Sequence, residues 1–396
     1  MVIYITLAIA AVAGIYSYNY LASLLGRKPA RVSFILLGAC AAVYALYEIW
    51  AEPSLFGFIR SLVLIFIFYT SATLPLCLAA FSEDVFYYIR RLAGYGKRSS
   101  RSRAVFTAAI ILAISGVTTI IYGMVVTKTD FKVYPFEMKS VRIPENFDGL
   151  RIVQISDLHL GSFPEGDKDL PRAFEMINAL KPDAILLTGD ILNDNSRDMR
   201  PWIKHLKSLE APMGKYAVLG NHDYCEYDHD LTEAGRRENM DSLASYYAQC
   251  GFRLLDDENA PLSAAGDTIY VAGVENWGLG PFPARGDIEK ALSGIPDDAF
   301  TILMSHDPAH FEKIVSRYPK MVDLTLSGHT HAMQFGFEFN EKLRWSPIKY
   351  RSPHWAGPYM ENGRTLYVNR GLGFHFFPAR VGIRPEITLI TLKRQK

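Results

Sequence analysis

Long apolar runs dominate the first third of the chain. Four of them, at residues 2–25, 32–50, 61–82 and 104–127, come close to or exceed the roughly 20 residues that a helix needs to cross a bilayer. Helices of soluble proteins rarely stay almost uncharged over such a length, so four in succession predict an all-α, four-helix transmembrane region. The first run has no Lys or Arg before it and is too long for a cleaved signal peptide, so we interpret it as a helix too.

From residue 151 the pattern changes to short β-branched runs that alternate with helical or polar segments. A helix is predicted at 168–180, and fully apolar strands indicate a sheet covered on both faces. The predicted architecture is therefore layered α/β, with residues 1–127 as the membrane domain, 128–140 as a linker and 141–396 as the soluble domain. The predicted strands are 151–156, 184–188, 216–219, 268–272, 300–304, 324–326, 366–368 and 387–390.

The charge balance gives no sign of a nucleic-acid partner. The chain has 42 Lys and Arg against 41 Asp and Glu, a net charge of +1. Among its four cysteines, Cys40 and Cys77 lie in apolar runs. Cys225 and Cys250 lie in the soluble part and could pair if that part faces an oxidising compartment, which the sequence leaves open.

Basic residues in the short loops predict the orientation. Loops rich in Lys and Arg stay in the cytoplasm, so the loops after the first and third helices are expected there, whereas the loop between the second and third helices has only Arg60. The N-terminus and everything after Thr127 are then expected on the outer side. The basic residues are Arg27, Lys28 and Arg31 after the first helix and Arg90, Arg91, Lys97, Arg98, Arg101 and Arg103 after the third.

Polar residues follow directly on five of the predicted strands. In open α/β sheets, ligands bind outside the carboxyl ends of the strands, so these residues are expected to converge on one place. The five blocks are Asp157-Leu-His159, Gly189-Asp190, Gly220-Asn221-His222-Asp223, Ser305-His306-Asp307 and Ser327-Gly328-His329-Thr330-His331.

Carboxylate, imidazole and amide groups suit hard to borderline divalent metals such as Mn, Fe and Zn. A single carboxylate such as Asp190 can bridge two ions, because it has two oxygens. Two ions about 3.5–4 Å apart clamp the attacking and leaving oxygens of a displacement at phosphorus and lower the pKa of bound water. The five blocks therefore favour metal-assisted phosphoester hydrolysis.

The order of these blocks resembles the calcineurin-like metallophosphoesterase superfamily over roughly residues 150–370. The segments 327–331 and 367–371, Ser-Gly-His-Thr-His and Tyr-Val-Asn-Arg-Gly, are most similar to its bacterial membrane-associated branch. The resemblance implies a four-layer α/β sandwich that holds two divalent metal ions. One departure is Ala332-Met333-Gln334, where many relatives have Gly-Gly-Gln.

The resemblance also implies a role for each motif residue. Asp190 would bridge the two ions, His222 would protonate the leaving oxygen or stabilise its charge, and Asp223 would accept a hydrogen bond from the His222 ring. A water bridging both metals would be the nucleophile. The first metal would be held by Asp157, His159 and His331, and the second by Asn221, His306 and His329.

Several residues outside the five blocks could have either a functional or a structural role. Arg370, in a Gly-rich turn, would bind a phosphate oxygen or form a structural salt bridge. Asn193 and Asp194 follow Gly189-Asp190 and could support a metal ligand from behind. The aromatic residues Phe374, Phe376, Phe377, Trp345, Trp355 and Tyr359 would contact the bilayer or pack in the core, and His205, His229, His310, His354 and His375 are expected to be structural.

The sequence thus predicts a membrane-anchored, metal-dependent phosphohydrolase of the bacterial inner membrane. Its catalytic domain is expected on the periplasmic or extracellular side, with a phospholipid or lipid-linked pyrophosphate as the preferred substrate and no partner protein evident. Some family members cleave a nucleotide-linked lipid precursor, but that substrate is cytoplasmic. A sensor or scaffold that has lost catalysis would show decayed motifs, and a phosphoprotein phosphatase would need peptide recognition, for which no feature stands out.

Overall fold

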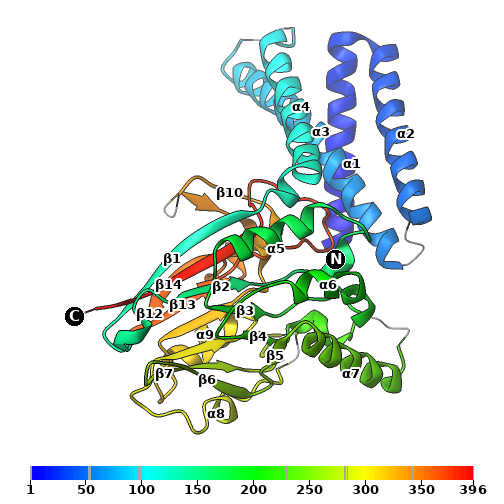
Figure 1. Ribbon diagram of the computed structural model, residues 1–396. Coiled ribbons are helices and arrows are strands. Elements are labelled where there is room, and N and C mark those ends of the chain that lie inside the picture. The colour runs from blue at the N-terminus through cyan, green and yellow to red at the C-terminus, as the bar shows by residue number, and fades with distance from the viewer. Residues whose placement is uncertain are drawn as a thin grey trace. The chain divides into compact units, whose positions relative to one another are not determined.

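The structure is a computed structural model that divides the chain into two compact units, Met1–Tyr122 and Gly123–Lys396 (Figure 1). It describes residues 2–51, 55–95, 100–227, 231–280, 282, 284–340 and 343–395. Lys97, Arg98 and His229, which the sequence analysis singled out, lie outside these ranges.

The first unit consists of long apolar helices. Three described segments, Arg27–Leu46, Phe58–Leu92 and Arg103–Thr129, are long and apolar enough to cross a membrane. The first helix is present, but its crossing of the membrane stays a prediction. The helices are α1 (Val2–Leu25), α2 (Arg27–Ala51), α3 (Leu55–Leu92) and α4 (Arg103–Val125).

These helices pack through small residues and leave their large apolar side chains exposed. Ala30, Ala80 and Ala109 are buried around Tyr20, whereas Ile35 is 68% exposed. Small residues let helix backbones approach closely inside a bilayer, where lipid rather than protein covers the outer face. The pattern is typical of membrane helices.

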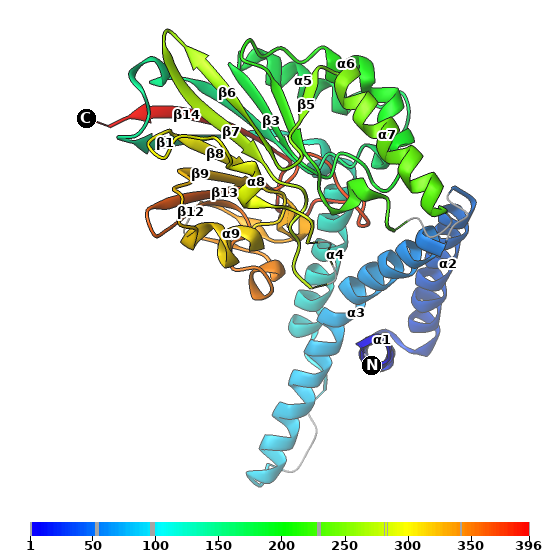
Figure 2. The same ribbon diagram turned by 90° about the horizontal axis from the view of Figure 1, so that it is seen from below.

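The second unit is built on two six-stranded mixed sheets (Figures 1 and 2). The first has the order β1-β14-β2-β3-β4-β5 and the second β12-β13-β9-β8-β7-β6, with a separate hairpin β10-β11. The strands of the first sheet are β1 (Lys132–Ser140), β2 (Arg151–Ile155), β3 (Ala184–Thr188), β4 (Lys215–Val218), β5 (Phe252–Leu254) and β14 (Glu386–Arg394). Those of the second are β6 (Glu258–Ala264), β7 (Asp267–Gly273), β8 (Thr301–Met304), β9 (Leu324–Ser327), β12 (Gly357–Glu361) and β13 (Arg364–Val368), and the hairpin pairs β10 (Phe337–Glu338) with β11 (Arg344–Trp345).

The apolar residues of the sheets form distinct buried clusters. Ile152 and Leu186 of the first sheet share one cluster with Ile302 and Leu326 of the second. Another cluster joins the first sheet to α5 (Asp169–Ala179) and α7 (Glu233–Gln249), and a third joins the second sheet to α8 (Ile288–Ala291) and α9 (Ala309–Lys313). All eight predicted strands and the predicted helix at α5 are present, so the α/β prediction is confirmed.

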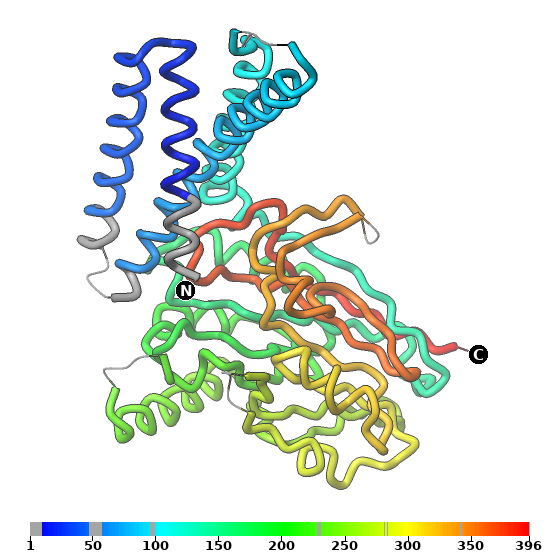
Figure 3. The backbone as a smooth tube through the Cα atoms, turned by 180° about the vertical axis from the view of Figure 1, so that it is seen from behind, coloured from blue at the N-terminus to red at the C-terminus, as the bar shows by residue number. Residues whose placement is uncertain are grey.

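The predicted linker at 128–140 is wrong for most of its length. Residues Lys132–Ser140 form β1, which pairs in parallel with β14 from Lys132↔Glu386 to Ser140↔Arg394. Figure 3 shows these two segments running side by side. Pro135 argues against a central strand, but β1 lies at the edge of its sheet, where a residue without a backbone N–H is tolerated.

Candidate metal centre

The carboxyl ends of five strands bring the motif residues together. Asp157 and His159 follow β2, Asp190 follows β3, and Asn221 lies in the short helix η5 (Asn221–Tyr224) after β4. From the second sheet, His306 follows β8, His329 follows β9, and His331 opens the helix η7 (His331–Gln334). Each of these strands has at least one parallel neighbour, so the side chains beyond their carboxyl ends gather at the same edge.

Four of these residues form a first group of possible metal ligands: Asp157, His159, Asp190 and His331. Nε2 of His159 lies 3.0 Å from Nε2 of His331, which in turn lies 3.2 Å from Oδ1 of Asp157. Oδ2 of Asp190 is 3.7 Å from Nε2 of His159. The ligand atoms therefore face a common point.

A second group contains Asp190, His306 and His329. Oδ2 of Asp190 lies 3.1 Å from Nε2 of His306, and that nitrogen lies 3.3 Å from Nδ1 of His329. Asp190 is common to both groups, and the same oxygen, Oδ2, lies close to His159 in one and to His306 in the other.

The far nitrogens of two rings are held by backbone carbonyls. Nδ1 of His159 lies 2.9 Å from the carbonyl oxygen of Leu192, and Nδ1 of His306 lies 2.8 Å from that of Thr188. A ring that donates from Nδ1 keeps Nε2 free of its proton and available to a metal. This is the tautomer that the two groups require.

Asn221 supplies a direct test of whether the site fits a metal. Its Oδ1 is buried and has no hydrogen-bond partner among the described residues. A buried amide oxygen without a partner costs about 1–3 kcal/mol, and a divalent cation removes that cost. The donor set of carboxylate, imidazole and amide oxygen fits Mn, Fe or Zn.

The electrostatics of the two groups favour a cation. Burial lowers the pKa of His159 well below its usual range, so the ring is neutral. Burial alone would lower the pKa of His306 too, but the Asp190 carboxylate raises it to about 10. Although burial opposes it, the His306 and His222 rings hold the pKa of Asp190 well below its usual range. The Asp190 carboxylate therefore attracts positive charge to the place where a metal ion would bind.

The backbone at the centre is unusual. Five expected ligands have positive φ angles, a conformation that non-glycine residues adopt rarely and that clusters at functional sites. They are Asp157 (50°), His159 (43°), Asp190 (53°), His329 (69°) and His331 (48°). Ala332 and Met333 also have positive φ, a conformation that glycine adopts more readily.

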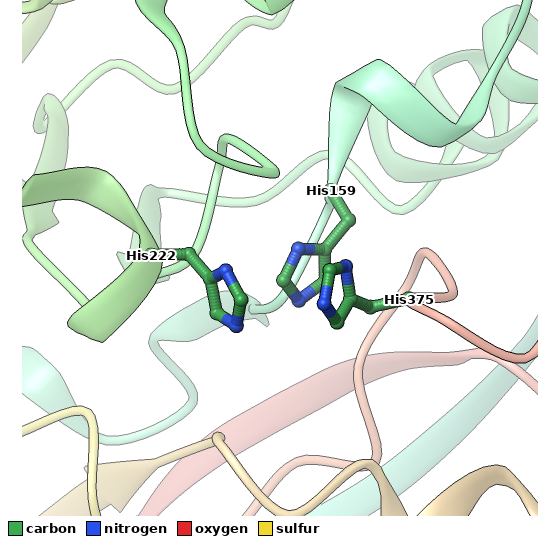
Figure 4. Close-up of side chains that lie close together, drawn as sticks. All are labelled: His159, His222 and His375. Atoms are coloured by element: carbon green, nitrogen blue, oxygen red, sulfur yellow. The ribbon is translucent and has the colours of Figure 1, made fainter. Parts of the chain in front are cut away.

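A cleft of about 450 Å³ opens onto the two groups. Asp190, Asn221, His329 and His331 form part of its wall. His222 and His375 lie in the same wall, and Figure 4 shows their rings close to that of His159. The cleft therefore gives access to possible ligands of both groups and to the rings of His222 and His375.

The predicted contact between Asp223 and the His222 ring is wrong. Nδ1 of His222 lies 2.6 Å from the backbone carbonyl oxygen of Asn193. Asp223 is fully buried and accepts three backbone N–H groups instead, at 2.9 Å from Asp190 and Gly220 and 3.1 Å from Leu192. It thus fixes the turn that carries Asp190, while Asn193 supports the site through its main chain.

His375 is the residue that sequence reasoning missed, because it was expected to be structural. Its ring centroid lies 4.7 Å from that of His159, with the planes nearly parallel, and 4.4 Å from that of His222. His159, His222 and His375 also offer ligand atoms close enough to hold a metal together. The only sequence signal was its place just after the Gly-rich turn 369–373.

The structure does not bring Arg370 to the centre. Its guanidinium is paired with Glu386, at 2.5 Å, and with Glu338, and it lies over the ring of Tyr134. Arg370 is 3% exposed, so the structural salt bridge explains this residue and phosphate binding does not. Cys225 and Cys250 are both buried and are not joined by a disulfide bond.

Comparisons with known proteins agree with this centre. The family model of the calcineurin-like phosphoesterases matches residues 150–333. A metallophosphoesterase of Bacillus subtilis, YkuE, is 36% identical over 259 residues, which are 65% of this chain and 83% of that protein.

Two further relatives are each 31% identical to this chain. A transmembrane protein with metallophosphoesterase domain from Danio rerio is 31% identical over 326 residues, 78% of this chain and 69% of its own. The UDP-2,3-diacylglucosamine pyrophosphatase LpxG of Chlamydia trachomatis is 31% identical over 278 residues, 58% of this chain and 81% of its own. The chain therefore belongs to the calcineurin-like metallophosphoesterase family, and it is a hydrolase of the phosphoric ester class.

Proposed function

We propose that this protein is a membrane-anchored phosphohydrolase with two metal ions that cleaves a phosphoester or pyrophosphate bond of a lipid or another membrane-associated substrate. The convergence of the expected ligands on Asp190, next to a cleft that also contains His222, carries the proposal. The core clusters on both sides of each sheet also support the four-layer sandwich that the family resemblance implies.

The metal ligands, Asp190 and His222 would have different roles in hydrolysis. Two divalent ions held at this centre would polarise the phosphoryl oxygens and supply a water of lowered pKa as the nucleophile. Asp190 sets the separation of the two groups, since one of its oxygens belongs to both. His222 donates from Nδ1 to the carbonyl of Asn193, and in its doubly protonated form it would give the Nε2 proton to the leaving oxygen.

Hydrolysis by the purified full chain in detergent with Mn tests the proposal. We expect turnover of p-nitrophenyl phosphate or bis-p-nitrophenyl phosphate, and at least a roughly 100-fold loss in Asp190→Asn, because the bridging charge disappears. Asp169→Asn is the matched control, since that carboxylate is half-exposed at the start of α5. If the native chain hydrolysed neither compound, a sensor or scaffold would be the better interpretation.

The orientation is a separate part of the proposal. Arg27, Lys28 and Arg31 lie at the beginning of α2, and Arg90 and Arg91 lie at the end of α3. The excess of basic residues there favours a cytoplasmic location of these ends, with the catalytic unit on the outer side of a bacterial inner membrane. An alkaline phosphatase fusion after Thr127 should be active, whereas a fusion within residues 93–102 should not.

The outcome of the fusion experiment bears on the substrate. An outer location favours a phospholipid or a lipid-linked pyrophosphate. An inactive fusion after Thr127 would place the centre in the cytoplasm and favour a nucleotide-linked lipid, the kind of compound in the name of LpxG.

Lipid profiling tests the substrate class in cells. A strain that lacks the protein and a strain that carries Asn221→Ala should accumulate the same phospholipid or lipid pyrophosphate, because the variant loses a metal ligand but keeps the fold. If neither strain accumulated such a lipid, the lipid substrate would be excluded. Faster turnover of a phosphopeptide than of bis-p-nitrophenyl phosphate would favour a phosphoprotein phosphatase.

A further inference from the structure

The β10-β11 hairpin of the second unit exposes an apolar face. Phe337 pairs with Trp345, and the backbone N–H of Phe339 donates to the carbonyl of Leu343 at 3.0 Å. Residues that pair across two strands lie on the same side, so these four side chains share one face, which we call the aromatic face. The rings of Phe337 and Trp345 are stacked 6.0 Å apart, and those of Phe337 and Phe339 lie 5.7 Å apart.

The hairpin is inverted relative to an ordinary surface hairpin. Glu338 and Arg344, the charged pair between the apolar positions, point toward the domain, where Glu338 is bound to Arg370. On the aromatic face, Phe339 is 77% exposed, Leu343 55% and Phe337 40%. A soluble surface would place the charges outward, so contiguous exposed apolar groups of this kind mark an interaction site.

The position of the hairpin along the chain indicates what covers the aromatic face. The last apolar span ends at Thr129 and β1 begins at Lys132, a stretch of at most about 11 Å when fully extended. The hairpin lies against the beginning of β1, because the hydroxyl of Tyr134 donates to Glu338 at 3.4 Å. Lys132 and Phe339 also border one cavity of about 200 Å³. Chain connectivity therefore keeps the start of β1, against which the hairpin lies, within that distance of the end of the span.

We propose that the aromatic face inserts into the headgroup region of the bilayer and docks the catalytic unit on the membrane that its own helices span. Aromatic side chains, above all Trp, favour this region because they combine an apolar ring with a polar edge. The exposed Lys132 at the border of the same cavity adds attraction to anionic headgroups. Docking of this kind requires the membrane helices and the hairpin, and it does not depend on catalysis at the metal centre.

Depth-dependent quenching in the full-length protein tests the docking. A fluorophore is attached to Phe339→Cys in a chain with Cys40→Ala and Cys77→Ala, which leaves only the buried Cys225 and Cys250. The protein is placed in nanodiscs of phosphatidylcholine and phosphatidylglycerol. We expect spin-labelled lipids to quench this fluorophore several-fold more than the control and aqueous iodide to quench it several-fold less.

Val141→Cys in the same background is the matched control. Val141 is 66% exposed and follows the far end of β1, roughly 30 Å from Lys132. Equal quenching at both positions would overturn the docking. Shielding of the Phe339 label from both iodide and lipid would assign the face to a protein contact, such as a second copy of this chain, and would overturn it as well.

A triple variant, Phe337→Ser, Phe339→Ser and Leu343→Ser, separates docking from catalysis. Its hydrolysis of soluble bis-p-nitrophenyl phosphate should equal that of the native chain, because the face lies outside the cleft. In this triple variant the fluorophore is attached to Trp345→Cys, because Phe339 is already replaced. Quenching of this label by spin-labelled lipids should fall to the level of the Val141 control. A protein without hydrolytic activity would contradict the proposed function but leave the quenching result intact.

Discussion

The side-chain amide of Asn221 donates from Nδ2 to the hydroxyl of Tyr227, 3.0 Å away. The other end of the amide, Oδ1, is buried without a hydrogen-bond partner among the described residues. The ring of Tyr227 also lies 4.7 Å from that of His222. One tyrosine thus orients the side chain of a proposed metal ligand and packs against the proposed proton donor.

Tyr227→Phe should weaken metal binding while it keeps the ring in place. Loss of the hydroxyl lets the Asn221 amide rotate, and removal of such an outer partner typically costs about 10- to 100-fold in affinity. Titration calorimetry with Mn measures the change. Tyr246→Phe, which removes a hydroxyl bound to the exposed Arg200, is the control and should bind Mn like the native chain. Equal affinities for both variants would disprove the orienting role.

Metal removal should destabilise the second unit. Without cations, Asn221 Oδ1 stays unsatisfied and the histidine rings stay crowded against one another. A bound ion stabilises a fold by about 2.7 kcal/mol when its concentration is 100 times Kd. Thermal unfolding in detergent should therefore shift to lower temperature with a chelator and return with added Mn. In Asp190→Asn the response to Mn should be much smaller, and a full response there would argue against a bridging carboxylate.

Arg370→Met should lower stability and leave substrate affinity unchanged. The substitution leaves the fully buried carboxylate of Glu386 without its cationic partner. Removing one member of a buried ion pair costs about 3–5 kcal/mol of stability. Thermal unfolding measures the loss of stability, and the KM for bis-p-nitrophenyl phosphate reports on substrate binding. Adding Glu386→Gln should restore part of the stability. A raised KM with normal unfolding would revive the phosphate-binding role of Arg370.

His375→Ala should weaken metal binding through His159. The His375 ring stacks on His159 and contacts His222, so its removal leaves space into which His159 can rotate. His375→Phe keeps a ring of similar shape and should retain the affinity for Mn in calorimetry. If the Phe variant bound Mn as weakly as the Ala variant, a ring nitrogen rather than packing would be responsible.

The sequence predicted the residues of the centre because each follows directly on a strand. Strands such as Ala184–Thr188 are apolar throughout, so their bounds can be read locally, and the carboxyl ends of parallel strands meet. Edge strands carry a weaker signal. Lys132–Ser140 contains Pro135 and alternates only in part, and it became a strand because β14 lies beside it.

The sequence by itself determined the chemistry, since the types and order of the motif residues identify a metal-dependent phosphoesterase and the apolar runs identify membrane helices. The tertiary structure decided the contacts between distant segments and the contacts made by main-chain atoms. The Asn193 carbonyl on His222, the His375 ring on His159 and the two glutamates on Arg370 all belong to these classes. Main-chain groups are the same in every residue, and proximity between residues that are tens to hundreds of positions apart leaves no local pattern, so only the fold could reveal these contacts.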